Sequence, residues 1–553
     1  MKFLIRLFKS LSRLERWTFI VAGLVFISSS VFIISNFIYS NTKIAPVFGG
    51  EYIEGIIGQP VFINPVLANT ETDKDLITLI FSNLSDLAEN IKRDEGAQVW
   101  NVRLKENIFW DDNVSITSDD IIFTIESIQN TDANSPLLSV WKDIKAERVS
   151  EIEIKLILPE VYVFFESTLN NLKIIPKHIF GSIPTTNFRL SDYNFEPIGN
   201  GPFKFVSFQK SRSGFISEYR LVRNEAYFGQ KPYLEKITFK FYENEDELIK
   251  NFNSGIIDGF GGLSFKNFSR ININHRLFEI IMPRYYAIFF NSYNQNILKE
   301  KNVRLALTYA TDKKGLLEKI FNNKALSAEG PLVLGMDGFV AEEKSESVNF
   351  SIEKANEILE NGGWKINEEG VYEKIINGKT ERLEFNLVVP DIPFLIEAAD
   401  LIKENWEKAG IKLNNKIFSL HKINEEAIKT RNYEMILFGN IFSDIKSPDL
   451  SSFWHSSERF YPGLNLALYG NETVDSLIQS IRKNLNDSKR QNDISSLQFL
   501  IIQDRPAIFL FSPYYFYVTK NKLNGFNEKL ISSAGDRFGN IENWYIKTVR
   551  VFE

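Results

Sequence analysis

The chain has 553 residues, and 64 Lys and Arg side chains stand against 70 Asp and Glu, which gives a formal net charge of −6. Hydrophobic residues make up 44% and charged residues 24%, an ordinary globular composition that argues against a disordered chain. The acidic balance gives no support to a nucleic-acid binder. The absence of cysteine excludes disulfides, thiolate metal sites, iron–sulfur clusters and cysteine-linked lipids.

The N-terminal region has the pattern of a membrane anchor. Residues 1–16 carry five Lys or Arg and one Glu, a net charge of +4, and residues 17–39 contain no charged side chain. At about 1.5 Å per residue, this run spans roughly 34 Å, enough for a bilayer core of about 30 Å. Trp17 and Tyr39 lie at its two ends, where interfacial aromatic residues are common. The pattern predicts a basic tail over 1–16, a transmembrane signal-anchor over 17–39 and a linker over 40–50.

Because basic residues favour the cytoplasmic side, we expect a single-pass protein of the cell membrane whose C-terminal body is extracytoplasmic. Two alternatives remain at this point. One is a cleaved signal peptide, although the apolar run is longer than a secretory core and lacks a small-x-small cleavage site. The other is a buried helix of a soluble protein.

The rest of the chain alternates predicted strands and helices. Thr117 has the position of an N-cap with Asp120 three residues later, and Asn377-Gly378 is typical of a hairpin turn. This pattern predicts a mixed α/β protein with at least two large lobes. The expected strands or hairpins are 99–110, 151–159, 370–390, 411–418 and 432–442, and the expected helical regions are 117–130, 246–255, 301–321, 351–364 and 393–410.

Little in the sequence indicates catalysis. The four histidines do not form a helical metal pair such as H-E-x-x-H, and neither a G-x-S-x-G nor a Walker A motif is present. The carboxylate pairs Asp111-Asp112 and Asp119-Asp120 are interpreted as a solvated turn and a helix N-terminus rather than as acid–base groups.

Eight segments along residues 51–550 carry a resemblance to known proteins: 54–84, 100–128, 174–180, 197–208, 223–242, 302–321, 355–364 and 449–457. Together, in this order, they resemble the family 5 extracellular solute-binding proteins. These are the peptide/nickel-binding receptors of ABC importers, and the resemblance is greatest to the oligopeptide- and dipeptide-binding proteins. One departure is Asn113, which stands where the family usually has glycine; asparagine also adopts positive φ.

The resemblance implies a two-lobed fold like that of the large, type II periplasmic peptide-binding proteins. It places lobe I at 51–290 with an inserted subdomain at about 75–195, lobe II at 291–512, and a return to lobe I at 513–553. The two crossings between the lobes are expected near residues 289–291 and 511–515. The resemblance also implies a monomer without enzymatic activity, catalytic residue, metal or cofactor.

The same resemblance implies a ligand site in which two extended segments hold the backbone of a peptide, by β-augmentation. An aspartate beyond the second segment would bind the ammonium group of the ligand; Asp444 is the first choice and Asp449 the second. Trp454 either walls the pocket or anchors its loop in the core. The implied ligand-binding residues are Asn69, Thr70 and Glu71 in the first segment, Gly439, Asn440 and Ile441 in the second, Asp444 and Trp454.

The expected function is therefore the capture of peptides in a closing cleft and their delivery to the permease subunits of an ABC importer. Family members are usually secreted or anchored through a lipidated cysteine, so in this cysteine-free chain we expect residues 17–39 to be the tether. The alternatives are a receptor for a non-peptide solute, a signalling or chaperone protein with this fold, and an extracytoplasmic hydrolase.

Overall fold

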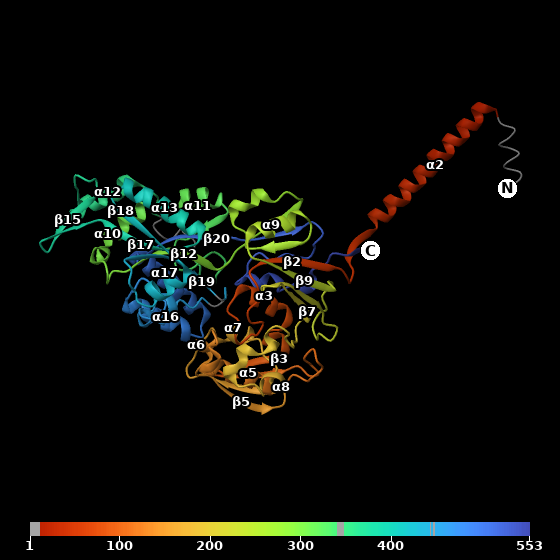
Figure 1. Ribbon diagram of the computed structural model, residues 1–553, viewed down its shortest axis with the longest axis horizontal. Helices are drawn as coiled ribbons and strands as arrows, with labels where there is room; N and C mark the ends of the chain where they lie inside the picture. The colour runs from red at the N-terminus through yellow and green to blue at the C-terminus, as the bar shows by residue number, and fades with distance from the viewer. Residues whose placement is uncertain (1–11, 340–347, 443, 446–447, 553) are drawn as a thin grey trace.

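The computed structural model describes residues 12–339, 348–442, 444–445 and 448–552. Helix α2 (Arg13–Ser40) projects away from a two-lobed body (Figure 1). It contains the predicted span 17–39, and it is the one helix among the described residues that is long and apolar enough to cross a membrane. None of its residues is buried, so the alternative of a buried globular helix is wrong. Residues 1–11 of the expected basic tail lie outside the described residues.

The first lobe is built on a seven-stranded mixed sheet. Strand β2 lies between β9 and β10 and runs parallel to both. Ile237, Phe239 and Phe241, at alternate positions of β9, are buried in the large core of this lobe, and Tyr242 is buried in a smaller cluster. In sheet order the strands are β11 (His275–Ile280), β21 (Tyr515–Lys520), β10 (Gly259–Gly261), β2 (Glu51–Ile57), β9 (Lys236–Tyr242), β8 (Ile216–Arg223) and β7 (Phe203–Lys210).

The second lobe has its own six-stranded sheet and core. The expected hairpin turns at Asn377 and Gly378, both at positive φ, between β15 (Tyr372–Ile376) and β16 (Lys379–Arg382). β15 also pairs with β14 (Lys365–Ile366). In order, the main sheet contains β13 (Ala325–Ser327), β20 (Ala507–Pro513), β12 (Arg284–Phe290), β19 (Met435–Ile441), β17 (Glu384–Pro390) and β18 (Lys412–Phe418).

The chain crosses between the lobes at residues 281–283, between β11 and β12, and at Tyr514, between β20 and β21. The second crossing lies where it was expected. The first was expected at 289–291 and that position is wrong, because the whole of β12 is paired with β19 and β20 in the second-lobe sheet. The apolar run of β12 is typical of a buried strand in either lobe, so the pattern alone does not assign it.

A subdomain is inserted in the first lobe. Its sheet has the order β3 (Ala88–Arg93), β4 (Val99–Leu104), β6 (Glu153–Ile157) and β5 (Lys145–Ser150). Helix α5 (Ser118–Gln129) begins as predicted, with Thr117 and Asp120 in a capping box. Asn113 adopts a φ of 69°, the conformation expected of the residue that replaces glycine.

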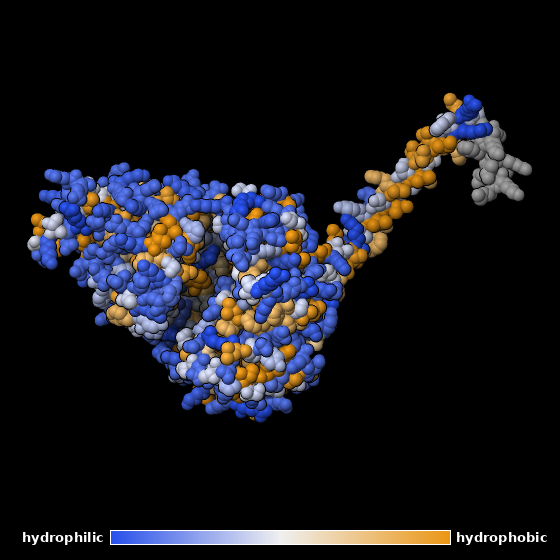
Figure 2. All heavy atoms as spheres, viewed as in Figure 1, coloured by the Kyte–Doolittle hydropathy of each residue, from blue (hydrophilic) through white to orange (hydrophobic). Residues whose placement is uncertain are grey.

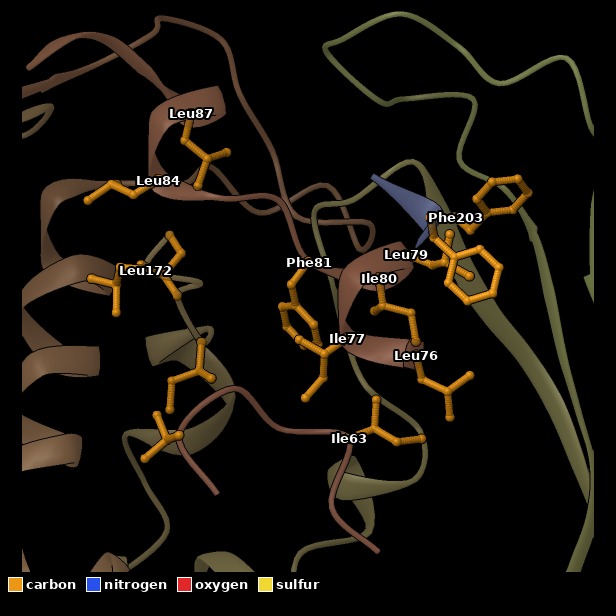
Figure 3. Packing of buried hydrophobic residues seen from close by; sticks show 14 of the residues in the cluster. Ile63, Leu76, Ile77, Leu79, Ile80, Phe81, Leu84, Leu87, Leu172 and Phe203 are labelled. Atoms are coloured by element: carbon orange, nitrogen blue, oxygen red, sulfur yellow. The ribbon is translucent and has the colours of Figure 1, made fainter. Parts of the chain in front are cut away.

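The subdomain and the first lobe share one hydrophobic core (Figure 3). Leu76 and Ile80 of α3 (Glu71–Ile80) pack near Phe203 of β7. The core continues through Leu84 of α4 (Leu84–Leu87) to Leu172 of the subdomain. Because this apolar core has no break, we expect the subdomain to move together with the first lobe.

Further helices lie in the two lobes and in the inserted subdomain. The region 301–321 forms two helices rather than one, because Asp312 accepts a hydrogen bond from the backbone N–H of Gly315 and starts a new helix. The helices are α6 (Leu138–Trp141), α7 (Phe165–Asn170), α8 (Lys177–Phe180), α9 (Glu245–Asn253), α10 (Lys301–Tyr309), α11 (Lys313–Phe321), α12 (Ile352–Asn361), α13 (Pro393–Lys408), α14 (Leu420–Lys422), α15 (Ser451–Trp454), α16 (Glu472–Lys483) and α17 (Asp487–Asp504).

The segment 40–50 is not the simple linker that was expected. Within it, β1 (Thr42–Pro46) pairs antiparallel with β22 (Thr548–Phe552), and Val47 N–H donates to the carbonyl of Lys547 at 3.0 Å. These residues therefore form a two-stranded ribbon at the foot of α2. The partner strand is distant in the sequence, and a linker composition carries no sign of it.

Candidate functional site

The two lobes face each other across a hollow (Figure 2). The crossings at 281–283 and Tyr514 join the lobes in line with β12 and β20, which are neighbours in the second-lobe sheet. Two short crossings side by side form the usual structure of a hinge. The hollow between the lobes is thus the candidate functional site.

The second predicted segment, Gly439–Ile441, is the end of strand β19. On one side β12 pairs with it through to Ile441, opposite Arg284. On the other side β17 pairs only at Met435 and Ile436 and ends at Pro390. Within the described part of the chain, no strand pairs with this second edge at 439–441. Backbone N–H and C=O groups on a free edge can pair with an added strand.

Side chains around this edge are closely packed on the β12 side. Gly439 lies against Tyr286, and a Cβ on the glycine would approach the tyrosine ring to 2.8 Å. Asn440 is buried and its amide donates to the Tyr285 hydroxyl at 3.5 Å. Ile441 is 58% exposed. The segment therefore has a fixed backbone with one open edge.

The first predicted segment, Asn69–Glu71, is extended only in part. Asn69 is exposed in a loop, and the backbone of Thr70 is extended (φ −102°, ψ 152°). Glu71, in contrast, is the first residue of α3, so its assignment to an extended segment is wrong. The Thr70 side chain accepts from the Asp73 N–H at 3.1 Å, which is an N-cap. Thr70 followed by Asp73, with acidic residues in the first turn, is a sequence signal for this helix start.

Glu71 is held on both sides of its carboxylate. One oxygen lies 2.8 Å from Lys74 Nζ, and the other accepts from the backbone N–H of Ala534 at 3.2 Å. Ala534 begins the short helix η9 (Ala534–Phe538), which packs on α3. The start of α3 is therefore fixed to a segment that belongs to the end of the described chain.

A buried charge cluster, Glu54–Asp75–Arg537, fixes α3 more strongly, and sequence reasoning missed it. The Arg537 guanidinium contacts Asp75 of α3 at 2.7 and 2.8 Å and Glu54 of β2 at 2.8 Å. Burial raises the pKa of both carboxyl groups, and the guanidinium opposes that rise. The Tyr517 hydroxyl donates to Glu54 at 2.9 Å. This cluster joins β2, α3, β21 and η9 beside the first segment.

Asp444 is half-buried and accepts a hydrogen bond from the Ser167 hydroxyl. Ser167 lies on α7 of the subdomain, and the Asn171 amide donates to the same hydroxyl at 3.3 Å. Since the subdomain shares the core of the first lobe, the Ser167–Asp444 bond joins the two lobes. Asp444 thus lies where the two lobes meet, and Ser167 is a partner that no local pattern indicates.

Asp449, the second choice for the ammonium group, is fully engaged by protein groups. It accepts from the Tyr162 hydroxyl at 3.0 Å and the Ser451 N–H at 2.9 Å, and it forms an ion pair with Arg482 at 3.2 Å. Burial raises the pKa of the Tyr162 hydroxyl, and the charge of Asp449 adds to that rise. These contacts favour a structural role for Asp449.

Trp454 is fully buried in the second-lobe core, against the rings of Phe289, Phe509 and Tyr469. Of its two interpretations, this position matches the core anchor, and its assignment as a ligand-contacting residue is wrong for this conformation. The described residues contain no group of three or more His, Asp or Glu side chains that could hold a metal ion.

The comparisons with known proteins extend along most of the chain. The family model of bacterial extracellular solute-binding proteins, family 5, matches residues 84–461. The oligopeptide-binding protein AppA of Bacillus subtilis is 26% identical over 527 residues, which cover 91% of this chain and 92% of that protein. The nickel-binding protein NikA of Staphylococcus aureus is 23% identical over 412 residues, covering 74% of this chain and 76% of that protein.

Solved structures share the two-lobed fold. AppA from Bacillus subtilis in complex with a nonapeptide aligns with a TM-score of 0.73 at 24% identity, covering 91% of this chain and 100% of that chain. The ABC transporter substrate-binding protein CtaP from Listeria monocytogenes aligns with a TM-score of 0.77 at 23% identity, covering 90% of this chain and 99% of that chain. By the family match and the shared fold, the chain belongs to the bacterial extracellular solute-binding proteins of family 5.

Proposed function

We propose that this protein is a membrane-tethered, extracytoplasmic receptor that captures peptides in the cleft between its lobes and delivers them to an ABC importer. The observation that carries the proposal is the free edge of β19 at Gly439–Ile441. The names of several relatives, which are oligopeptide- or dipeptide-binding proteins, support the ligand class. The protein is not an enzyme in this proposal.

The free edge explains how ligands of varied sequence are held. A peptide that adds as a strand to Gly439–Ile441 pairs its backbone N–H and C=O groups with those of β19. Each such hydrogen bond contributes about 0.5–1.5 kcal/mol, whatever the side chains are. The exposed Ile441 side chain lies beside this edge and contacts the ligand. Asn69 and Thr70, at the start of α3, hold the ligand from the first lobe.

Asp444 binds the α-ammonium group of the peptide in this proposal. It follows the free edge by a few residues, and its bond with Ser167 places it at the junction of the two lobes. A carboxylate accepting from an ammonium group forms a charge-assisted hydrogen bond, worth about 1.5–3 kcal/mol. Binding there would favour the closed conformation, since the same carboxylate contacts the first lobe.

The tether in the proposal is helix α2. Its surface is exposed along its whole length and apolar between Trp17 and Tyr39, so water is a poor solvent for it. The basic residues before its apolar run favour a cytoplasmic N-terminus and an extracytoplasmic body. A tethered receptor stays near the membrane importer, which raises the rate at which the two proteins meet.

The test is calorimetric titration of the full-length protein in nanodiscs with alanine peptides of graded length. Native mass spectrometry first identifies and removes any ligand that co-purifies. Peptides with N-methylated backbone amides serve as the matched control, because they keep the side chains and lose hydrogen-bond donors. We expect unmodified peptides to bind and N-methylated ones to bind more weakly.

Equal binding of the methylated and unmodified peptides would contradict strand addition. Binding of nickel–histidine or a sugar without any peptide binding would replace the proposed ligand class with a non-peptide solute. Failure of every solute to bind would favour a signalling or chaperone role.

A further inference from the structure

The ribbon of β1 and β22 lies at the foot of the membrane helix. Strand β1 begins at Thr42, two residues after α2 ends at Ser40, and it pairs over its full length with β22. Figure 1 accordingly places the C end of the chain beside the end of α2. The ribbon is therefore the first part of the body beyond the proposed membrane span.

One residue pair sets the depth of the ribbon relative to the membrane. The Arg550 guanidinium lies over the Tyr39 ring, 4.1 Å from its centroid, and Arg550 Nη1 donates to Thr42 Oγ1 at 3.1 Å. Tyr39 is the aromatic residue at the end of the apolar run, where tyrosines lie at the level of lipid headgroups. Arg550 therefore lies at the same level.

One face of the ribbon is amphipathic. Residues directly opposite each other in an antiparallel pair share a face, so Ile44 and Arg550 lie on the same face as Thr42 and Phe552. Ile44 is 59% exposed and Phe552 is 65% exposed. Exposed apolar groups beside a cation are typical of a surface that lies in a membrane interface.

The charge of the ribbon has one sign. Lys43, Lys547 and Arg550 are exposed, and residues 42–48 and 545–552 contain no Asp or Glu, in a chain whose net charge is −6. Glu553, which follows, lies outside the described residues. Basic residues near an anionic bilayer surface are attracted to it.

We propose that the β1–β22 ribbon lies in the headgroup layer of the outer leaflet, where its basic residues, Arg550 on one face and Lys43 on the other, bind the phosphates of anionic phospholipids and Phe552 and Ile44 enter the interface. This inference rests on the proposed membrane span of α2. The ribbon then attaches the body to the membrane through two strands rather than through a flexible linker. The body is held in one orientation, with the cleft directed consistently toward a membrane partner.

The test uses the absence of cysteine from the chain, since a single introduced cysteine takes one fluorescent label. Three full-length variants are compared in nanodiscs: Thr548→Cys on the ribbon, Phe26→Cys on α2, and Ile375→Cys on β15 of the second lobe. Phe26 and Ile375 are each 73% exposed and form a matched pair. Nitroxide lipids labelled on the headgroup or on the acyl chain quench the fluorophore according to its depth.

We expect the label at 548 to be quenched several-fold more by headgroup nitroxide than the label at 375, and the label at 26 to be quenched by acyl-chain nitroxide. Quenching at 26 without quenching at 548 overturns the ribbon inference and leaves the anchor standing. An absence of quenching at 26 overturns both the ribbon inference and the membrane anchor. A protein partner on the ribbon would give the first of these results.

Variants that lose positive charge test whether the ribbon binds anionic headgroups. Lys43→Gln with Lys547→Gln removes two cations and keeps the contact between Arg550 and Tyr39. In nanodiscs containing phosphatidylglycerol, we expect this double variant to reduce quenching at 548 several-fold. Equal quenching of both proteins, or equal quenching in pure phosphatidylcholine, overturns the assignment of anionic headgroups.

Discussion

The Tyr162 hydroxyl donates to Asp449 Oδ2 at 3.0 Å, and this bond joins the inserted subdomain to the second lobe. Around it, the Val163 N–H donates to the Arg482 carbonyl at 2.9 Å and Lys483 pairs with Glu160 at 2.7 Å. These contacts join the two lobes outside the crossings at 281–283 and Tyr514. They therefore stabilise a closed arrangement of the lobes.

Replacing Tyr162 with Phe should shift the lobes toward an open state. The variant keeps the ring and loses one hydrogen bond to a carboxylate, a change of about 1.5–3 kcal/mol. Pulsed electron paramagnetic resonance between labels on Leu190→Cys and Ile375→Cys, which are 80% and 73% exposed, measures the distance between subdomain and second lobe. We expect a larger population of long distances in the variant and a return to short distances on adding peptide. An unchanged distribution with and without ligand would contradict hinge closure.

Local features of the fold could be predicted from the sequence. Thr117 with Asp120, the Asn377-Gly378 turn and the positive φ of Asn113 each depend on neighbouring residues, and each is found as expected. The assignment of β12 to the second lobe could not be predicted, because an apolar run does not specify its partner strand. The local pattern predicts a strand, and its pairing with distant strands decides which sheet it joins.

The contacts that build the site are non-local. Ser167 and Asp444 are 277 positions apart, and Asp75 and Arg537 are 462 apart. No periodicity connects such pairs in one sequence. The role of Trp454 also could not be predicted, since a tryptophan beside a loop can line a pocket or fill a core. Its packing against Phe289 and Phe509 identifies it as a core residue.

The membrane anchor has a simple test. Because α2 is apolar and wholly exposed, we expect the full-length protein to remain with membranes after alkaline carbonate washing, with its N-terminus intact. N-terminal sequencing and mass spectrometry of the washed fraction measure both points. Release of a chain that begins near residue 41 would instead identify α2 as a cleaved signal.

Arg537→Met should destabilise the first lobe. It leaves Glu54 and Asp75 buried without a cation, which costs about 3–5 kcal/mol of the free energy of unfolding. Urea unfolding of the protein in detergent measures the loss. Arg103→Met is the matched control, since its pairs with Glu89 and Glu153 are on the surface and should each contribute less than about 1 kcal/mol.

A second variant distinguishes the charge from the shape of Arg537. Adding Glu54→Gln and Asp75→Asn to Arg537→Met removes both unpaired carboxylates. We expect this triple variant to recover part of the lost stability. No recovery would show that packing, rather than uncompensated charge, is the cause.

Asp111→Asn should stabilise the protein at neutral pH. Burial raises the pKa of Asp111 from 3.8 to about 6, although the Gly199 N–H and Lys204 oppose the rise. A raised pKa in the folded state means that the carboxyl group costs stability as the pH rises from about 4 to 6. The asparagine keeps an acceptor for Gly199 and carries no charge.

We expect the variant to be more stable by about 1–2 kcal/mol at pH 7, a value discounted for partial exposure, and to equal the wild type below pH 4. Thermal unfolding across this pH range measures the difference. Asp143→Asn, whose carboxylate is 63% exposed, is the control for the removal of one carboxylate. A pH-independent effect of Asp111→Asn would contradict the assigned pKa.

Asp444→Asn should weaken peptide binding, because Asp444 is proposed to bind the ligand's α-ammonium group. Replacing it with Asn keeps the shape and an acceptor for Ser167, and it removes the charge. The α-ammonium of a peptide is largely charged below its pKa of about 7.7–8.0. We expect a loss of about 1.5–3 kcal/mol in peptide affinity, roughly 10- to 150-fold in Kd.

N-acetylation of the peptide should weaken the wild type by a similar amount and scarcely affect Asp444→Asn, because both changes delete the same contact. Calorimetric titration of the two proteins with the two peptides closes this double-mutant cycle at a pH near 6.5, where the amine is charged. Asp143→Asn, exposed on the subdomain, controls for the loss of one negative charge from the protein. If the two losses add independently, Asp444 does not contact the ammonium group. Since Asp449 already contacts Tyr162 and Arg482, another group in the cleft would then bind the ammonium group.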